Sequence, residues 1–378
     1  MQQHPIHNSP WFIRLLAWPA LVLYAVSLLL YTIPPAHWWP MGILGIGWPY
    51  TWLAFGVLLL LLYRFRFAYR RFWLYSWCMG MLVMSNVWAM HTFSGQWSTQ
   101  KENHLLRIMQ WNCEQLAGID TFHNRFSTDR SVAVQYIRQQ QPDVIMMQDF
   151  QNYASPVLWS NLSLIRDTLG YPFVHFAPYF SDTKPWGTNT EGVIIFSRRP
   201  FIQTGRVQYP NREYAPYIGW ADIAMNGKPV RLATTHFVSM HLNLGVLPAD
   251  TFGFIYKQDT SVLVTGNKLK KLRYFQAYHT TQAQTLRAFL DTCAVPVILG
   301  ADLNSVPTSY VYSKVKGPLK DAFLETGFGW GKTYRNSVLP NLRIDYLLHH
   351  PQLQVLQMHS HTLHISDHKP LLADFGWR

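Results

Sequence analysis

Two apolar segments in the second half of the chain run directly into acidic, amide or imidazole side chains. The segment 297–300 leads to Asp302 and Asn304, and a second segment close to the end of the chain leads to Asp367 and His368. Short apolar segments bounded by turn residues are typical of strands, and a sheet holds the side chains at its strand ends rigidly. Carboxylates, amides and imidazoles held in this way can bind a divalent cation and move a proton at a phosphate. The spacing therefore indicates metal-assisted hydrolysis.

Four further polar residues occupy the same place relative to an apolar segment. These residues are Asn112, Asp149, His236 and Asp345. A single Asn or Asp at a strand end is an ordinary turn residue. Asp345 is different because it lies inside an apolar strand, where a buried carboxylate needs a partner such as a histidine. Six strand ends of this kind are difficult to explain as turns alone, and together they predict one polar cluster.

The segments that position these residues alternate with turn signals from Leu105 onward. Apolar patterns predict strands over Leu105–Trp111, Asp143–Met147, Gly192–Phe196, Ile218–Met225, Val230–Thr235, Val295–Gly300, Ile344–Leu348 and Leu371–Phe375. Patterns with a helical period predict helices over Asp129–Gln140, Leu158–Leu169 and Gln276–Asp291. Many strands with few helices favour an α+β fold in which two packed sheets are flanked by helices.

Taken together, the motifs resemble those of the endonuclease/exonuclease/phosphatase superfamily, which includes DNA-repair endonucleases, DNase I-like nucleases, sphingomyelinases and inositol-polyphosphate phosphatases. The matching motifs are Trp111–Asn112, Gln148–Asp149, Gly192–Ser197, Thr235–His236, Gly300–Asn304, Arg343–Tyr346 and Ser366–His368. The resemblance covers the chain from Leu105 to Phe375 and is to a membrane-anchored bacterial member. It implies a four-layer α/β/β/α two-sheet sandwich that hydrolyses a phosphate ester with Mg²⁺ or Mn²⁺.

The resemblance also implies a role for each matched residue, beginning with those near the metal. Asn112 and Asp149 would bind the ion, with Asp367 on it or beside it. Asp302 and Asn304 would orient the attacking water and contact the scissile phosphate. Oxygen ligands of this kind suit Mg²⁺, which binds through one or two carboxylates and the substrate phosphate.

The two histidines complete the implied machinery. His236 would stabilise charge on a phosphate oxygen. His368 would act as general base or as a second phosphate contact, and Asp345 would orient its ring. An imidazole with a pKa near neutrality can take the proton of the attacking water.

One position departs from the family pattern. The family normally has Glu where this chain has Asp149, and Asp is shorter by one methylene. Mg²⁺ requires nearly ideal octahedral geometry, so the shorter carboxylate would displace or weaken the ion. Two interpretations of Glu114 are open: it supplies the carboxylate that the shorter Asp149 cannot, or it is an ordinary surface acid. Two functions follow: an active metal-dependent phosphodiesterase, or a non-catalytic protein that binds a phosphate ligand through a degenerate metal site.

The first hundred residues differ sharply in composition from the rest. No Asp or Glu precedes Glu102, and ten of the 16 Trp lie before it. Three apolar segments, 11–33, 41–63 and 72–93, contain at least about 20 residues, the length that a helix needs to cross a bilayer. A signal peptide does not explain them, because two further apolar segments follow the first. The composition predicts an N-terminal bundle of about three transmembrane helices.

The loops between these segments predict the orientation. The loop Arg64–Arg71 is strongly basic, whereas the loop Pro34–Pro40 has no Lys or Arg. The positive-inside rule places the basic loop in the cytoplasm, which makes the catalytic domain extracytoplasmic. In a bacterium the protein would lie in the inner or plasma membrane. We expect three parts along the chain: a membrane anchor over 1–97, a tether over 98–104 and a catalytic domain over 105–378.

The predicted substrate is a phosphodiester in a lipid headgroup or a nucleic acid, and the bilayer is a second predicted partner. Two interpretations of the basic segment Lys268–Arg273 are open: it attracts phosphate or anionic headgroups by its charge, or it is the solvated face of a helix. The segment Phe252–Tyr256 is apolar and would approach the membrane. Fold and site determine the reaction class rather than the substrate. The oligomeric state is left open by the sequence.

Overall fold

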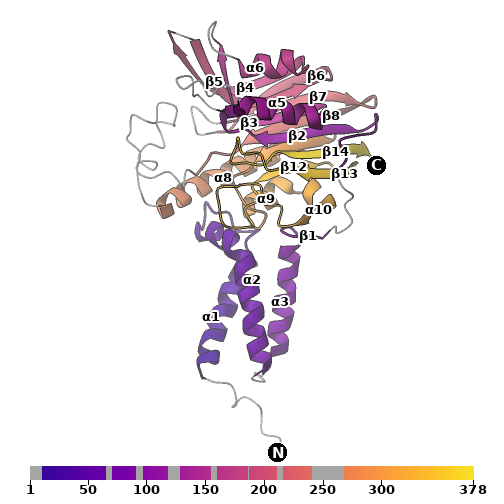
Figure 1. Cartoon of the computed structure of the whole chain (residues 1–378). Helices are drawn as coiled ribbons and strands as arrows, with labels where there is room; N and C mark the ends of the chain where they lie inside the picture. Colours follow the sequence, from indigo (N-terminus) through magenta and orange to yellow (C-terminus); the bar gives the residue numbers. More distant parts are fainter. Residues whose placement is uncertain are drawn as a thin grey trace, which may run out of the picture.

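The computed structural model describes residues 11–64, 70–90, 97–117, 128–154, 160–185, 187–210, 216–240 and 268–378. Figure 1 shows two connected parts, a bundle of helices and a β-sandwich with helices on its outer faces. The segment Phe252–Tyr256 and residues 65–69 of the basic loop lie outside the described residues.

Three helices form the bundle: α1 (Trp11–Ser27), α2 (Pro40–Arg64) and α3 (Arg70–Met84). They pack around a buried core that is rich in aromatic rings. The Phe55 ring stacks on Tyr24 with a centroid distance of 4.4 Å and on Trp73 with one of 5.1 Å. One residue from each helix therefore meets at the centre.

Only one of the described helices has the length and hydropathy to cross a membrane. Helix α2 has 25 residues and a mean hydropathy of 1.7 in its most apolar part. Helices α1 and α3 have 17 and 15 residues, fewer than the roughly 20 that a span requires. The third predicted span extended to residue 93, but α3 ends at Met84 and strand β1 (Ala89–Met90) follows. The predicted bundle of three membrane spans is therefore not shown.

The sandwich consists of two six-stranded sheets. The first sheet has the order β13 (Leu353–Ser360), β14 (Leu371–Trp377), β2 (Leu106–Asn112), β3 (Val144–Ala154), β5 (Gly187–Ser197) and β4 (Phe173–Lys184). The second has the order β10 (Lys320–Asp321), β12 (Asp345–His349), β9 (Val297–Asp302), β8 (Lys228–His236), β7 (Tyr217–Met225) and β6 (Phe201–Gln208). A further short strand, β11 (Phe328–Gly329), pairs with β1.

Helices cover both outer faces of the sandwich. The helical segments are α4 (Glu114–Ala117), α5 (Thr128–Gln140), α6 (Asn161–Ser163), the π-helix η2 (Leu164–Thr168), α8 (Lys268–Asp291), α9 (Tyr310–Lys316) and α10 (Ala322–Thr326). One apolar core lies between the sheets, a second joins α5 to the first sheet, and a third joins α8 and α9 to the second. The predicted two-sheet α+β sandwich is confirmed, and its layers follow the order α/β/β/α.

The predicted elements of the sandwich match observed ones. Each of the eight predicted strands and three predicted helices overlaps an observed element. The long strands β4, β6 and β13, which were not predicted, all lie at sheet edges. The basic segment Lys268–Arg273 was expected to precede a helix at Gln276, but it forms the start of α8, where Lys271 is buried.

The helical bundle contacts two loops of the sandwich. Thr308 Oγ1 donates a hydrogen bond to the carbonyl oxygen of Gly45 in α2 (2.5 Å), and Asn341 Nδ2 donates to that of Ile46 (2.8 Å). A Cβ on Gly45 would lie 3.1 Å from the carbonyl oxygen of Thr308, so a glycine allows the close approach. These contacts connect the bundle and the sandwich directly.

A buried arginine links the predicted tether to the first sheet. Arg107 Nε and Nη2 donate to the two carboxylate oxygens of Asp374 at 2.7 and 2.8 Å, and neither side chain is exposed. Arg107 also donates to the carbonyl oxygens of Ser98 and Thr99. One guanidinium group therefore fixes β2, β14 and the start of the tether.

We expect Arg107→Met to lower the free energy of unfolding by about 3–5 kcal/mol, because Asp374 would remain buried without its charged partner. Urea denaturation followed by tryptophan fluorescence measures the change. The matched control is Arg166→Met, since Arg166 pairs with Asp167 in an exposed position and should leave stability unchanged. Equal stability of the two variants would contradict the prediction.

Candidate active site

Three neighbouring strands of the second sheet place His236, Asp302 and Asp345 side by side. In the parallel pair β8–β9, His236 is the register partner of Asp302. In the antiparallel pair β9–β12, Asp345 is also a partner of Asp302. All three side chains are buried. Strand register alone therefore puts Asp302 between an imidazole and a second carboxylate.

The first sheet contributes residues to the same edge of the sandwich. Asn112 ends β2, and its Nδ2 donates a hydrogen bond to Asp302 Oδ2 (2.9 Å). The parallel pairing of β2 and β3 brings Gln148 beside Asn112. Gln148 Nε2 crosses to the second sheet and donates to Thr234 Oγ1 (2.7 Å). The two sheets are thus joined by amide groups directly beneath the site.

Asp149 lies opposite His236, with 2.9 Å between Asp149 Oδ1 and His236 Nδ1. Its backbone φ is 49° and the β3–β5 register shifts there, so a bulge turns its side chain toward the site. Burial opposes the charged imidazole, but Asp149 outweighs it and raises the pKa of His236 to about 9. Burial likewise opposes the carboxylate, but His236 lowers the pKa of Asp149 to about 2. The two groups form an ion pair in which His236 is buried and Asp149 is half-buried.

A second carboxyl group lies behind this pair. The hydroxyl of Tyr179 lies 2.9 Å from Asp149 Oδ1 and 2.6 Å from Glu191 Oε1. Burial and the charge of Asp149 raise the pKa of Glu191 to about 7. Tyr179 therefore bridges two acidic groups, one of which, Glu191, has a pKa close to neutral pH.

His368 and Asp345 form the other imidazole–carboxylate pair. His368 Nδ1 lies 2.9 Å from Asp345 Oδ2 and 3.7 Å from Asp302 Oδ2. Burial disfavours the imidazolium, but Asp345 and Asp302 outweigh it and raise the pKa of His368 to about 10. Burial and the charge of Asp345 raise the pKa of Asp302 to about 6. The buried Asp345 therefore has a histidine within hydrogen-bond distance.

Asn304 closes the loop after β9. Its backbone N–H donates to Asp302 Oδ1 (2.9 Å), and its Nδ2 lies 3.2 Å from His236 Nε2. Asn304 has φ 46°, a left-handed conformation that asparagine tolerates better than most residues. The turn therefore directs both the backbone and the side chain of Asn304 into the cluster.

Asp367 and Glu114 lie at the more exposed side. The Asp367 backbone N–H donates to Glu114 Oε2 (2.9 Å), and Asp367 Oδ1 lies 3.6 Å from His368 Nε2. The Glu114 N–H donates to Asn112 Oδ1 (3.2 Å). Burial and the nearby charge of Asp367 raise the pKa of Glu114. Glu114 is therefore an exposed acid that lies beside the cluster.

The eight residues predicted for the site form one continuous set of contacts: Asn112, Asp149, His236, Asp302, Asn304, Asp345, Asp367 and His368. In the described part of the chain, one group with metal-binding spacing comprises Asp302, Asp345 and His368, whose ligand atoms lie within 4.8 Å of one another. This trio differs from the predicted metal set of Asn112, Asp149 and Asp367.

Sequence reasoning missed several residues that support the cluster. Thr333 Oγ1 accepts hydrogen bonds from the N–H groups of Ile344 and Asp345, and Tyr334 packs edge-on against His368. Neither residue stands at the end of a predicted strand, so no sequence pattern indicates either of them. A sequence pattern does indicate Glu191, because this residue directly precedes the predicted strand Gly192–Phe196.

The comparisons with known proteins concern this same region. The model of the Endonuclease/Exonuclease/phosphatase family matches residues 109–368. No curated protein matches the chain by sequence. Among solved structures, an endonuclease/exonuclease/phosphatase from Beutenbergia cavernae is 19% identical with a TM-score of 0.50, over 72% of each chain. This likeness shows the fold.

Two further solved structures are similar over 72% of this chain. The catalytic domain of human Nocturnin, with bound sulfate, is 17% identical over 94% of its length, with a TM-score of 0.47. D. rerio TDP2, in complex with a single-strand DNA product, is 15% identical over 99% of its length, with a TM-score of 0.46.

We expect Asp149→Asn to lower the pKa of His236 from about 9, because burial would then be opposed by a weaker negative field. Histidine Cε1–Hε1 NMR titration measures the pKa, with the resonance assigned by His236→Gln. Asp167→Asn is the matched control, since Asp167 is exposed. An unchanged pKa of His236 in Asp149→Asn would contradict the ion pair.

Proposed function

The chain belongs to the endonuclease/exonuclease/phosphatase family, and on this premise we propose that it is a membrane-anchored phosphodiesterase that depends on a divalent metal. The family comprises nucleases, phosphodiesterases and phosphatases. The observation that carries the proposal is the convergence of one amide and two imidazoles on the buried Asp302 carboxylate. A turn or a structural ion pair does not require so many groups around one acid.

The donor set fits a divalent cation. Five carboxyl groups, those of Glu114, Asp149, Asp302, Asp345 and Asp367, outnumber the two imidazoles in the cluster. Oxygen-rich, negatively charged sites suit Mg²⁺ or Mn²⁺. Asn112, Asp149 and Asp367 are the candidates that the family pattern offers to hold the ion. Asp302, Asp345 and His368 also have ligand spacing, but this second set would require a neutral His368. When bound, the cation would polarise the phosphoryl group and offset the negative charge.

The protonation states divide the remaining roles. Asp302 has a pKa of about 6, which suits a carboxylate that orients the attacking water and accepts its proton near neutral pH. His368 has a pKa of about 10, so it is an imidazolium at neutral pH. Of its two candidate roles, this state favours contact with a phosphate oxygen over that of general base. His236 is charged for the same reason and would stabilise a second phosphate oxygen.

The outward faces of the bundle support membrane anchoring. Large apolar side chains are exposed along the helices, including Val57 and Leu60 in α2 and Tyr75 in α3. Soluble proteins rarely expose so much contiguous apolar surface, whereas a bilayer would cover it. The ends of α2 and α3 farthest from the sandwich carry Arg64 and Arg70 (Figure 1). The positive-inside rule then places the sandwich on the extracytoplasmic side of the inner or plasma membrane.

A second candidate function is a non-catalytic protein that binds a phosphate ligand. The observation in its favour is the pairing of Asp149 with His236 and Tyr179, which already engages the carboxylate that the family pattern assigns to the metal. In this case the cluster would recognise a phosphate ligand without turning it over.

We expect the full chain in detergent to hydrolyse bis(p-nitrophenyl) phosphate with Mg²⁺ or Mn²⁺, and EDTA to abolish the activity. Asp302→Ala and His368→Ala should each lower kcat by about 10²–10⁴-fold, because each removes a group that handles a proton or charge in the transition state. Release of p-nitrophenolate is measured by absorbance.

Asp167→Asn, at an exposed aspartate, serves as the control and should retain activity. Absence of turnover with either metal, unrestored by Asp149→Glu, together with binding of inorganic phosphate, would refute the enzyme and support the binding protein. Recovery of turnover in Asp149→Glu would instead identify this position as the reason for a weakened metal site.

A further inference from the structure

A pocket of about 270 Å³ adjoins the catalytic cluster. Its lining comes from β12 in one sheet, from β13 and the start of β14 in the other, and from the segment after β11. Asp345 and Thr333 form part of its wall, and Lys369 directly follows His368 in the chain. A molecule in this pocket would therefore lie next to the His368–Asp345 pair.

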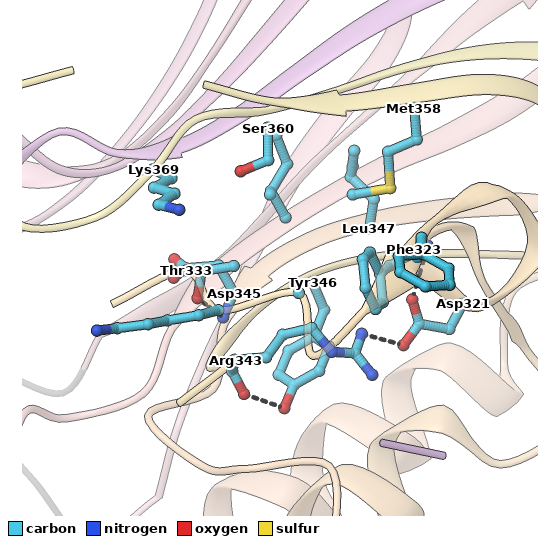
Figure 2. Close-up of a pocket in the computed structure, with 14 residues that line it drawn as sticks. Asp321, Phe323, Thr333, Arg343, Asp345, Tyr346, Leu347, Met358, Ser360 and Lys369 are labelled. Atoms are coloured by element: carbon cyan, nitrogen blue, oxygen red, sulfur yellow. Dashed lines mark hydrogen bonds and ion pairs between the residues drawn. The ribbon is translucent and has the colours of Figure 1, made fainter. Parts of the chain in front are cut away.

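The pocket has a polar end and an end where apolar side chains predominate. Figure 2 shows Lys369 and Ser360 at the first, and Leu347, Met358 and Phe323 at the second, where the ion pair of Arg343 with Asp321 also lies. Such a division suits a ligand that carries both a charged group and a hydrocarbon part.

Positive charge predominates in the lining. Arg343 pairs with Asp321 at 2.6 Å, and Asp345 pairs with the catalytic histidine. These are the acidic residues of the lining, so the ammonium groups of Lys332 and Lys369 are not offset by any carboxylate there, although Lys332 Nζ donates a hydrogen bond to the carbonyl oxygen of Ser337. The pocket is therefore complementary to an anion.

An exposed apolar surface leads from the bundle to this pocket. Met90 in β1 is the register partner of Phe328 in β11, and the two side chains are 78% and 60% exposed. Phe328 lines the pocket, and β1 follows α3, where Leu82 is 66% exposed. The surface that a bilayer would cover on α3 thus continues to the edge of the pocket.

We propose that this pocket binds the headgroup region of an anionic glycerophospholipid, and that this lipid is the substrate of the adjacent cluster. The inference rests on the membrane-anchored hydrolytic function proposed above. The lysines would hold a phosphate, and the apolar end would hold the glycerol and the first acyl carbons. A nucleic acid would meet the same lysines, but it gains nothing from the apolar path along α3 and β11.

The reaction is hydrolysis of one ester bond. The oxygen of water forms a new bond to phosphorus, and the ester P–O bond breaks with its electron pair on the departing alkoxide. One proton of the water goes to that alkoxide through Asp302, and the other remains on the phosphate monoester. The products are an alcohol and a phosphate monoester, with no redox change.

The test uses the full chain in nanodiscs that contain either phosphatidylglycerol or phosphatidylcholine, with Mn²⁺. Bis(p-nitrophenyl) phosphate and single-stranded DNA are added as soluble substrates in parallel reactions. We expect phosphatidylglycerol to be hydrolysed about tenfold faster than phosphatidylcholine. Lys332→Gln should raise the KM for phosphatidylglycerol by about tenfold, since it removes a charged contact to the lipid. Lys332→Arg, which keeps the charge, should retain most of the activity.

The matched control is Lys228→Gln. Its KM should equal that of the unaltered chain, because Lys228 lies at the start of β8, at the opposite end of that strand from His236. Hydrolysis of the aryl diester without that of phosphatidylglycerol would overturn this inference and leave the proposed phosphodiesterase intact. Cleavage of DNA in place of the lipid would identify a nuclease. An equal loss of activity on phosphatidylglycerol and on the aryl diester in Lys332→Gln would overturn the proposed contact between Lys332 and the headgroup. Turnover of none of them would overturn the proposed function itself.

Discussion

The buried carboxylate of Asp302 is the constraint on which the site depends. None of its surface is exposed, and a buried carboxylate without partners carries a large free-energy cost. The fold offsets this cost with the Asn112 amide, the N–H of Asn304 and two imidazoles. Because these groups come from both sheets, the sandwich must pack in one arrangement for the acid to be accommodated. The same arrangement is what a phosphate and a cation would encounter.

Two imidazole–carboxylate pairs lie beside the Asp302 carboxylate. His236 is paired with Asp149, and His368 with Asp345. Both pairs raise the pKa values of the imidazoles above neutrality, whereas burial and Asp345 raise the pKa of Asp302. The cluster therefore combines fixed positive charge, which suits phosphate oxygens, with a carboxylate able to exchange a proton near neutral pH. Several strongly shifted pKa values within one cluster are typical of functional sites.

The bundle is connected to this site through short pieces of chain. Thr308, which binds α2, lies four residues after Asn304, and Asn341, which also binds α2, lies four residues before Asp345. On the other side, Arg343 Nη2 donates to the carbonyl oxygen of Asn86 (2.9 Å), just after α3. The helices thus contact the loops that carry residues of the polar cluster rather than a remote face of the sandwich. This connection sets the position of the cluster relative to the bundle.

The sequence by itself determined the eight central strands and the membership of the polar cluster, because each motif is a local unit of apolar strand and polar end. It did not reveal the edge strands β4, β6 and β13, since an edge strand is buried on fewer sides and its apolar pattern is weaker. Only the tertiary structure decided the partners: Asp149 with His236, and Tyr179 between two acids. The packing of one sheet on the other selects the Asp149–His236 pair, whereas the neighbouring strands β3, β5 and β4 within the first sheet bring Asp149, Glu191 and Tyr179 together.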